Sequence, residues 1–379
     1  MYLPRPYPDE LVGSMLHRTE RILGIGREPL LWRLTGHKLS AHSFLITQYA
    51  GIAHAFGMSF ETFLGQHTVF PYLTAFQEED ERLRLVAELE RSHTVLRATA
   101  SLVRRAVIGE AWLRFCPVCV EFELKRYGES YWHRMHQLCG VSICSDHKVG
   151  LYTSPAAISR APRIPPPHEM VNSHTTSPEP SPTISIAIAM ASTAALWRVY
   201  DAHSLAETYR QRARELGYVY MGGKVHGALL AHDMLNFYGT DFLRRYGCLE
   251  DTGPRLRWPG KMFQASAHNS TTFKHILLQV FLDSKPTPSN NRIDFEGRRQ
   301  PKTRDWPQIE REAIECLTAE VSRHRQAGTR VNLEDLYDIA GIHSIVKTKK
   351  HRIPALMAWI EQFKKSPQST RIPGRRPRR

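Results

Sequence analysis

Acidic residues are scarce in this chain of 379 residues. It has 37 Asp and Glu against 51 Lys and Arg, which leaves a formal net charge of +14 at pH 7. An excess of this size, with a pI of about 9.6, is typical of proteins that neutralise phosphate groups. The composition therefore favours a nucleic-acid partner such as double-stranded DNA, with a generic basic soluble protein as the alternative.

Long hydrophobic runs are missing. The longest weakly charged run, ISIAIAMASTAALW, is shorter than the ~20 residues of a membrane helix and contains Ser and Thr. The opening sequence MYLPRPYPDELVGSML has no apolar core of the kind a secretory signal needs. We therefore expect no membrane partner and a cytoplasmic protein, associated with the nucleoid if its partner is DNA.

The motifs of common enzyme classes are absent as well. The chain has no G-x-x-x-x-G-K-[ST] phosphate loop, no G-x-S-x-G elbow and no H-E-x-x-H. Asp233, Asp241 and Asp251 are scattered and lack the strand setting of a metal-dependent nuclease. We expect no catalytic residues and no enzymatic activity.

Cysteine is rare, with 6 residues in total, yet four of them lie within one central stretch. Cys116 and Cys119 form C-P-V-C, and Cys144 and His147 form C-S-D-H. Four N and S ligands complete the tetrahedral coordination of a structural zinc ion and leave no open position for catalysis. In a reducing compartment such clusters are more often metal sites than disulfides. We therefore predict structural Zn²⁺ at these four residues, with buried thiols or a redox C-x-x-C as alternatives.

Three nearby side chains are further ligand candidates by composition. Cys139, His133 and His136 lie between the two halves of the cluster. The regular spacing favours Cys144 and His147 instead, so Cys139 is interpreted as a core residue. Cys248 and Cys316 are isolated and are interpreted as packing residues.

The rest of the chain predicts a mainly α fold. Apolar residues recur at helical spacing in the first 110 residues, as in Leu83, Val86 and Leu89, and alternation of period two is absent there. Asp9 and Ser59 are expected to cap two of these helices. The predicted segments are a multi-helix N-terminal domain (residues 1–110), a zinc-finger module (111–153), a Pro-rich linker or surface loop (154–183), a helical DNA-binding region (184–363) and a basic disordered tail (364–379).

A helix-turn-helix-like unit is predicted near the C-terminus. In LEDLYDIAGIHSIVKTKKHR, an apolar stripe of Leu333, Leu336 and Ile339 is followed by a short turn at Ala340 and Gly341. The second helix, IHSIVKTKKHR, is basic and would face phosphates or base edges, with a solvated helix face as the alternative. A weaker candidate pairs LAETYRQRARELG with KVHGALLAHDMLNFYG. The candidate DNA contacts are Lys347, Lys349, Lys350 and Arg352 on the second helix, and Arg375, Arg376, Arg378 and Arg379 in the tail.

The central stretch, FCPVCVEFELKRYGESYWHRMHQLCGVSICSDHKVGL, resembles the zinc-finger signature of the TniQ/TnsD family of bacterial transposon target-selection proteins. The one departure is Cys139, where the family has Pro. Two more segments are similar to that family: the N-terminal box LPRPYPDELVGSMLHR and the segment with His67, Thr68 and Pro71, which is TnsD-like. The matching residues are Cys116, Cys119, Arg126, Tyr127, Gly128, Glu129, Trp132, Arg134, His136, Gln137, Leu138, Gly140, Val141, Cys144 and His147 in the finger, and Pro4, Pro6, Tyr7, Glu10, Leu11, Ser14 and Arg18 in the box.

The resemblance implies a targeting adaptor. Such a protein recognises target DNA and recruits an AAA+ ATPase transposition regulator (TnsC-like) and, indirectly, a transposase. The alternative is an adaptor that docks on a guide-RNA (CRISPR) surveillance complex and reads little DNA sequence itself. Residues 1–150 are expected to dock partners.

Overall fold

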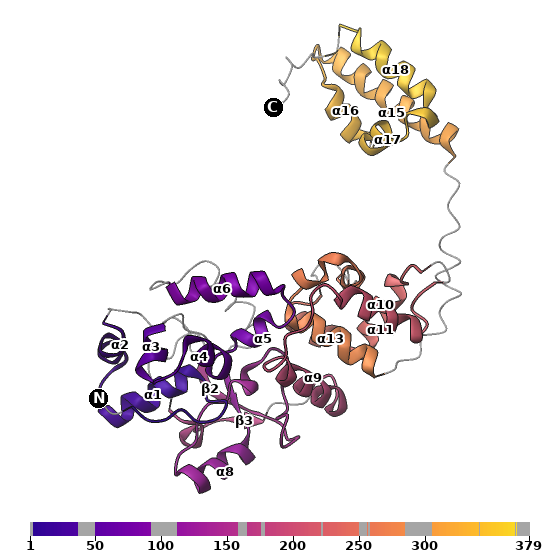
Figure 1. Cartoon of the computed structure of the whole chain (residues 1–379). Coiled ribbons are helices and arrows are strands. Elements are labelled where there is room, and N and C mark those ends of the chain that lie inside the picture. The colour runs from indigo at the N-terminus through magenta and orange to yellow at the C-terminus, as the bar shows by residue number, and fades with distance from the viewer. Residues whose placement is uncertain are drawn as a thin grey trace. The chain divides into compact units, whose positions relative to one another are not determined.

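The computed structural model of the chain describes residues 3–36, 50–91, 112–157, 165–175, 179–220, 223–249, 256, 258–284, 305–340, 342–367 and 369. These residues are mostly helical with one small sheet (Figure 1), so the mainly α prediction is confirmed. The chain divides into two compact units, unit 1 (Met1–Asn290) and unit 2 (Asn291–Arg379). Each unit has its own hydrophobic core. No described helix combines the length and apolar character needed to cross a bilayer.

Unit 1 begins with six described helices that pack around buried Leu, Phe and Met side chains. Ser59 caps α4 as predicted, because its hydroxyl accepts a hydrogen bond from the Thr62 amide at 3.1 Å. The predicted Asp9 cap is wrong: Leu11 occupies the N-cap of α1, and Asp9 has a positive φ of 57°. The six helices are α1 (Val12–Leu23), α2 (Arg27–Thr35), α3 (Ala50–Ala55), α4 (Phe60–His67), α5 (Phe70–Thr74) and α6 (Glu79–Arg91).

A three-stranded antiparallel sheet and a short helix form the central module. The sheet order is β1-β2-β3, and Phe115 pairs with Tyr152 while Tyr152 pairs with Thr175. The elements are β1 (Trp112–Phe115), α8 (Pro117–Tyr127), η1 (Met135–Gln137), β2 (Tyr152–Ala157), η2 (Pro167–Glu169) and β3 (His174–Thr175).

The structure corrects the interpretation of residues 154–183 as a linker, as far as it describes them. Residues 154–157 belong to β2, and the Trp132 indole donates a hydrogen bond to the Pro165 carbonyl at 3.1 Å. The Ser130 hydroxyl lies 2.9 Å from Nδ1 of His168. Proline is compatible with these positions: Pro155 lies in β2 beyond Tyr152 and Thr153, the residues that pair with β3, and Pro167 is the first residue of the 3₁₀ turn η2. The described residues 154–157 and 165–175 are therefore part of the central module.

Seven more helices are described in unit 1, and they share its core with the N-terminal half. The weaker helix-turn-helix candidate is not one, because α10 and α11 are separated by residues 216–226, which include an antiparallel bridge between Val219 and Val225. The helices are α9 (Pro182–Ala194), α10 (Leu205–Glu215), α11 (Gly227–Tyr238), α12 (Thr240–Arg245), η3 (Pro259–Phe263), η4 (Ala265–Asn269) and α13 (Thr272–Asp283).

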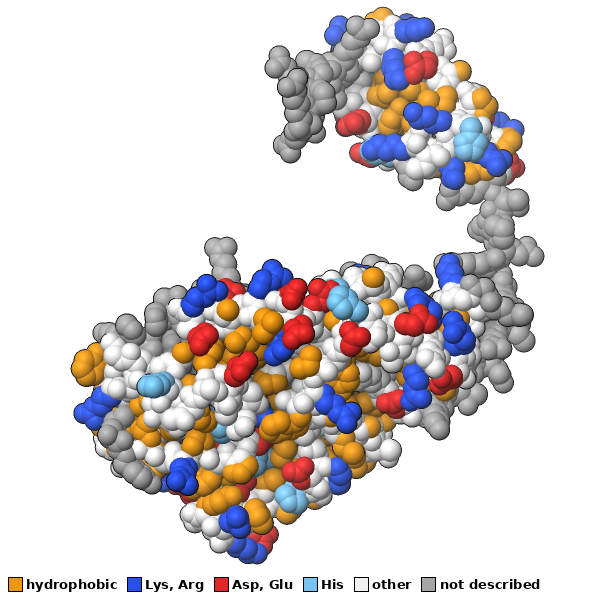
Figure 2. Space-filling model, viewed as in Figure 1, with side chains coloured by type: hydrophobic (Ala, Val, Ile, Leu, Met, Phe, Trp, Pro, Cys, Tyr) orange, Lys and Arg blue, Asp and Glu red, His pale blue; other side chains and the backbone are white. Residues whose placement is uncertain are grey.

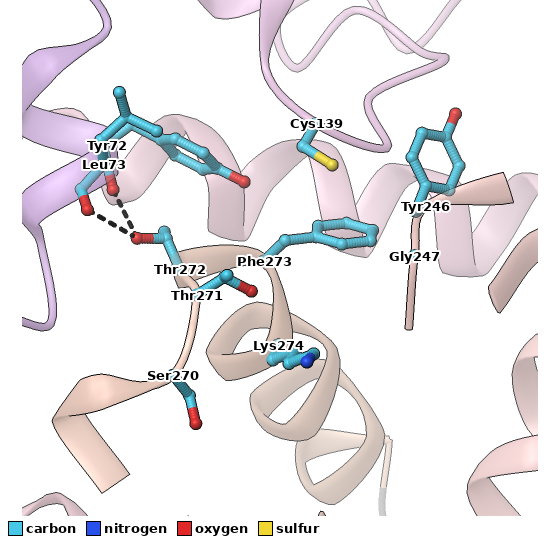
Figure 3. A pocket seen from close by; sticks show the side chains of 10 residues that line it. All are labelled: Tyr72, Leu73, Cys139, Tyr246, Gly247, Ser270, Thr271, Thr272, Phe273 and Lys274. Carbon is cyan, nitrogen blue, oxygen red and sulfur yellow. Dashed lines mark hydrogen bonds between the residues drawn. The ribbon is translucent and has the colours of Figure 1, made fainter. Parts of the chain in front are cut away.

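The first turn of α13, in the C-terminal part of unit 1, contacts both the N-terminal helices and the central module (Figure 3). The Thr272 hydroxyl donates hydrogen bonds to the carbonyls of Tyr72 and Leu73, at 2.7 and 3.3 Å. The Phe273 ring lies against Gly140, whose φ is +72°. A cavity of about 200 Å³ lies at this junction, and Cys139 lines it as a buried residue, as predicted for a core position.

Unit 2 is a small helical module with a separate core that includes Leu317, Leu336, Ile353 and Leu356, all fully buried. Asp305 caps α15, and Asn332 caps α16 through hydrogen bonds to backbone amides. The elements are α15 (Trp306–Gln326), α16 (Leu333–Ile339), α17 (His343–Thr348), η5 (Lys350–Arg352) and α18 (Pro354–Lys364).

The packing at Gly140 yields a stability prediction. A methyl group at Gly140 would lie 2.4 Å from the Phe273 ring, whereas one at Gly128, with a similar φ of +77°, would meet nothing within 4 Å. Gly128→Ala should cost only the left-handed backbone strain, about 1–2 kcal/mol. Gly140→Ala should cost about 1–3 kcal/mol more because it overpacks the junction. Thermal unfolding of both variants measures the difference, and equal losses would show that the junction is loosely packed.

Candidate metal centre

The first two ligand candidates lie at the start of α8. Cys116 is the N-cap residue and follows β1 directly, while Pro117 occupies the first turn, where its missing amide proton costs nothing. One helical turn then brings Cys119 back to the side of Cys116. Both thiols are buried. Pairing of β1 with β2 fixes the point at which this helix begins.

The other two candidates lie on a tight turn. The Cys144 amide donates to the Val149 carbonyl at 2.9 Å, and the Lys148 amide donates to the Cys144 carbonyl at 2.9 Å. Lys148 has a positive φ of 58°, which closes the turn. Cys144 is buried and His147 is exposed, so the imidazole covers the cluster from the solvent side.

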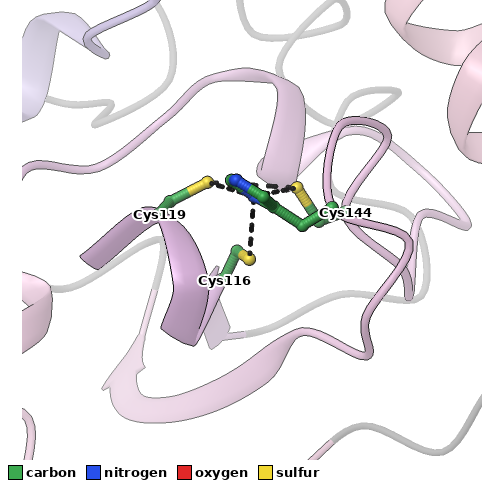
Figure 4. A group of neighbouring side chains, drawn as sticks. Cys116, Cys119 and Cys144 are labelled. Carbon is green, nitrogen blue, oxygen red and sulfur yellow. Dashed lines mark hydrogen bonds between the residues drawn. The ribbon is translucent and has the colours of Figure 1, made fainter. Parts of the chain in front are cut away.

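The four predicted ligands meet at one point (Figure 4). Nδ1 of His147 lies 3.6, 3.3 and 3.6 Å from the sulfur atoms of Cys116, Cys119 and Cys144, and the sulfurs of Cys119 and Cys144 are 3.9 Å apart. In a tetrahedral zinc site the sulfurs lie about 3.8 Å from one another and about 3.5 Å from the nitrogen, given bonds of about 2.3 and 2.0 Å. The spacing therefore fits a tetrahedral metal ion, and the cluster can hold one.

The three thiols lie so close together that they cannot all ionise at neutral pH unless a cation compensates their charges. A hydrogen bond from Cys119 is the largest cause that lowers the pKa of Cys116, to about 3. The contact with ionised Cys116 in turn raises the pKa of Cys119 strongly. A divalent ion removes this conflict because it stabilises each thiolate that binds it. The donor set thus fits a metal ion on chemical grounds as well as by its geometry.

A second group of possible ligands, Cys119, Glu123 and His133, shares one cysteine with the first. The two other members bind each other: Nε2 of His133 lies 2.5 Å from a Glu123 oxygen. Nδ1 of the same ring lies 3.4 Å from an Asp9 oxygen. Burial lowers the pKa of His133, but Asp9 and Glu123 outweigh it and raise that pKa to about 10. The group is therefore a buried ion cluster of His133, Glu123 and Asp9 that lies beside Cys119.

The N-terminal box binds directly to the module that carries the ligands. The Arg18 guanidinium donates to both carboxylate oxygens of buried Glu10, at 3.1 and 2.9 Å, and to Glu129 of the module at 3.2 Å. The Tyr7 hydroxyl donates to the same Glu129 oxygen at 2.9 Å. The Ser14 hydroxyl accepts a hydrogen bond from the Trp132 amide at 3.2 Å. The N-terminal box and the part of the central module around Glu129 therefore form one hydrogen-bonded contact.

Arg134 makes the second link. It is fully buried, its Nε donates to Asp9 at 2.6 Å, and one terminal nitrogen donates to the carbonyls of Gly65 and Thr68. Asp9 and Glu123 were missed in the sequence as functional residues. The sequence offered one indication of them, that both lie within the family-like segments. The pairing of Asp9 with Arg134 could not be predicted from local spacing, because it joins residues far apart in the chain.

The four candidate DNA contacts of unit 2 are all exposed. The helix predicted to carry them is shorter than expected: α17 ends at Thr348, and η5 follows at Lys350–Arg352. Ile339, expected in the apolar stripe, is 52% exposed, while Leu336 is buried. The apolar contacts to Leu336 in this core come instead from Ile342, the N-cap residue of α17, and from Val346 on α17, and both are buried. The tail residues Arg375, Arg376, Arg378 and Arg379 lie outside the described residues.

The fold and the cluster define a mostly helical protein built around a Cys/His module that can bind a metal ion. The family model for TniQ matches residues 1–151, and the model for Tn7-like transposition protein D matches residues 197–296. The two matches together span about two thirds of the chain. This chain belongs to the TniQ/TnsD family.

A curated relative agrees with this assignment. The Transposon Tn7 transposition protein TnsD of Escherichia coli is 28% identical over 155 residues. The alignment covers 38% of this chain and 30% of that protein, so the chain matches less than a third of its relative's length.

The geometry of the cluster predicts one metal ion per chain. Cobalt(II) added to metal-free protein should give the thiolate-to-cobalt charge-transfer band of a tetrahedral Cys₃His site, and Cys144→Ala should reduce this band because one thiolate is lost. Cys139→Ala is the matched control, since Cys139 is buried nearby but is not one of the four. A band that survives Cys144→Ala and disappears in Cys139→Ala would contradict the ligand set.

Proposed function

We propose that this protein is a non-enzymatic adaptor that selects target sites for transposition. In this proposal it binds target DNA and recruits an AAA+ ATPase transposition regulator (TnsC-like), and through that ATPase a transposase. The observation that carries the proposal is the composition of unit 1: the segment matched to TniQ and the segment matched to Tn7-like transposition protein D share one hydrophobic core. A shared core of this kind suits a protein that couples two binding events.

The metal in the Cys/His module is proposed to be structural Zn²⁺. Three sulfurs and one nitrogen at tetrahedral spacing favour zinc among the common cellular metals. Zn²⁺ would hold β1, α8 and the turn at Cys144 together, a role that matches the burial of all three cysteines. By holding these elements together, the ion would keep Glu129 positioned to accept hydrogen bonds from Tyr7 and Arg18 of the N-terminal box.

The N-terminal half of unit 1 is proposed to dock the ATPase. Large apolar side chains are exposed on several of its helices: Ile22 of α1 is 49% exposed, Trp32 of α2 is 60% exposed and Leu83 of α6 is 47% exposed. The proposal uses these side chains because large apolar and aromatic side chains form the cores of protein–protein contacts. Figure 2 shows hydrophobic side chains at the surface of this unit, interspersed with charged ones.

DNA binding is proposed for the basic surfaces, namely Lys347, Lys349, Lys350 and Arg352 of unit 2 and the tail arginines. The chain's charge of +14 supports it, because phosphate neutralisation provides affinity for any duplex. Sequence preference needs only a few base contacts, each worth about 1–3 kcal/mol.

The test is selection of bound fragments from sheared genomic DNA by the full-length protein, followed by sequencing. We expect one or a few enriched loci, bound about 10³-fold or more tightly than random duplex, with an affinity that falls steeply as salt rises. Absence of enrichment at every salt concentration, together with stable co-purification of a guide-RNA complex, would contradict direct target reading and favour the guide-RNA adaptor.

A further inference from the structure

Unit 2 lies almost wholly beyond the segments that the family models match, which end at residue 296. Charge is distributed unevenly over the residues of this unit. Residues 347–352 contain four Lys and Arg and no acid, and none of the four forms an ion pair with a described residue. Two basic residues elsewhere in the unit are paired, Arg323 with Glu320 at 2.7 Å and Lys364 with Glu361 at 2.5 Å, while others such as Arg325 are exposed singly. The stretch is distinguished by density: four exposed basic residues lie within six positions.

A short turn joins the two helices around this stretch, as in a helix-turn-helix unit. Residues 340–342 are all that separates α16 from α17, and the Ile342 amide donates to the Tyr337 carbonyl at 3.0 Å to close the turn. Ile342 and Val346 are buried against the core, which fixes the inner side of α17. At about 100° per residue, Lys347 and Thr348 lie away from Val346, and both are exposed.

The four basic residues divide into two groups by their place relative to α17. Lys347 is on α17 itself, whereas Lys349, Lys350 and Arg352 lie beyond its C-terminal end, in or beside η5. The exposed acids of α16, Glu334, Asp335 and Asp338, repel phosphates from the exposed side of that helix. An approaching polyanion is thereby directed to α17 and η5.

We propose that unit 2 is a duplex-DNA-reading module in which α17 enters the major groove, Lys347 contacts a guanine edge, and Lys349, Lys350 and Arg352 hold the backbone phosphates. In helix-turn-helix proteins the second helix lies in the groove, and Lys is a suitable donor to O6 and N7 of guanine. Residues beyond the helix end reach phosphates, which position the protein but carry no sequence information. This inference rests on the proposed function and assigns separate roles to its basic residues.

The experiment uses the full-length chain and a pool of random duplexes, from which the preferred site is selected and sequenced. Lys347→Ala should lose a guanine position from the selected site and bind the original site about 5- to 150-fold more weakly, while its affinity for random duplex changes little. Lys347→Arg should keep the guanine, because Arg makes the same contact. Arg352→Ala should weaken specific and random duplexes by the same factor and reduce the slope of log affinity against log salt by about 0.9.

Arg325→Ala is the matched control, an exposed basic change on α15, outside α17 and η5. It should leave the selected site unchanged. The inference falls if Lys347→Ala selects the wild-type site, or if Lys347→Ala and Arg352→Ala have the same effect; site selection by the chain then stands. If the wild-type protein binds no duplex even at low salt, both the inference and the proposed function fall.

Discussion

The buried carboxylate of Glu10 is the constraint on which the arrangement of unit 1 depends. A carboxylate with no exposed surface is tolerated only if hydrogen bonds and an opposite charge compensate it. Arg18 supplies both, with Ser14 and the Tyr7 amide as further donors. Burial raises the pKa of Glu10, and Arg18 opposes that shift. Because Arg18 also binds Glu129, the N-terminal segment reaches its low-energy state only when the central module presents Glu129.

The backbone links this ion network to the module that carries the Cys/His cluster. The backbone alongside them is directly paired: the Leu11 amide donates to the Trp132 carbonyl at 2.8 Å, and the Arg134 amide donates to the Asp9 carbonyl at 3.1 Å. Residues 128–150 contain little regular secondary structure, so the loop that bears Trp132 and Arg134 needs another source of order. Four ligands around one ion would provide it, since metal-binding free energy serves as folding free energy in such modules.

Local patterns allowed part of this structure to be predicted, while pairing at long range did not follow from them. The convergence of the four candidate ligands could be predicted from spacing, because the members of each pair, Cys116 with Cys119 and Cys144 with His147, lie only three residues apart. Ser59 was a correct cap for the same reason. Asp9 looked like a cap, yet its carboxylate binds Arg134, which is a tertiary contact. The prolines of residues 154–183 indicated a linker, because nothing local shows that β1 would accept β2 as its neighbour.

The central claim is that the metal-held module keeps the N-terminal segment in place, and amide hydrogen exchange tests it most directly. The Leu11 and Arg134 amides report on the pairing between box and module, and amides of α15 in unit 2 serve as the internal control. On removal of the metal with a chelator, the account predicts that the Leu11 and Arg134 amides lose protection while those of α15 keep theirs. Unchanged protection at Leu11 and Arg134 after the metal has left would contradict it.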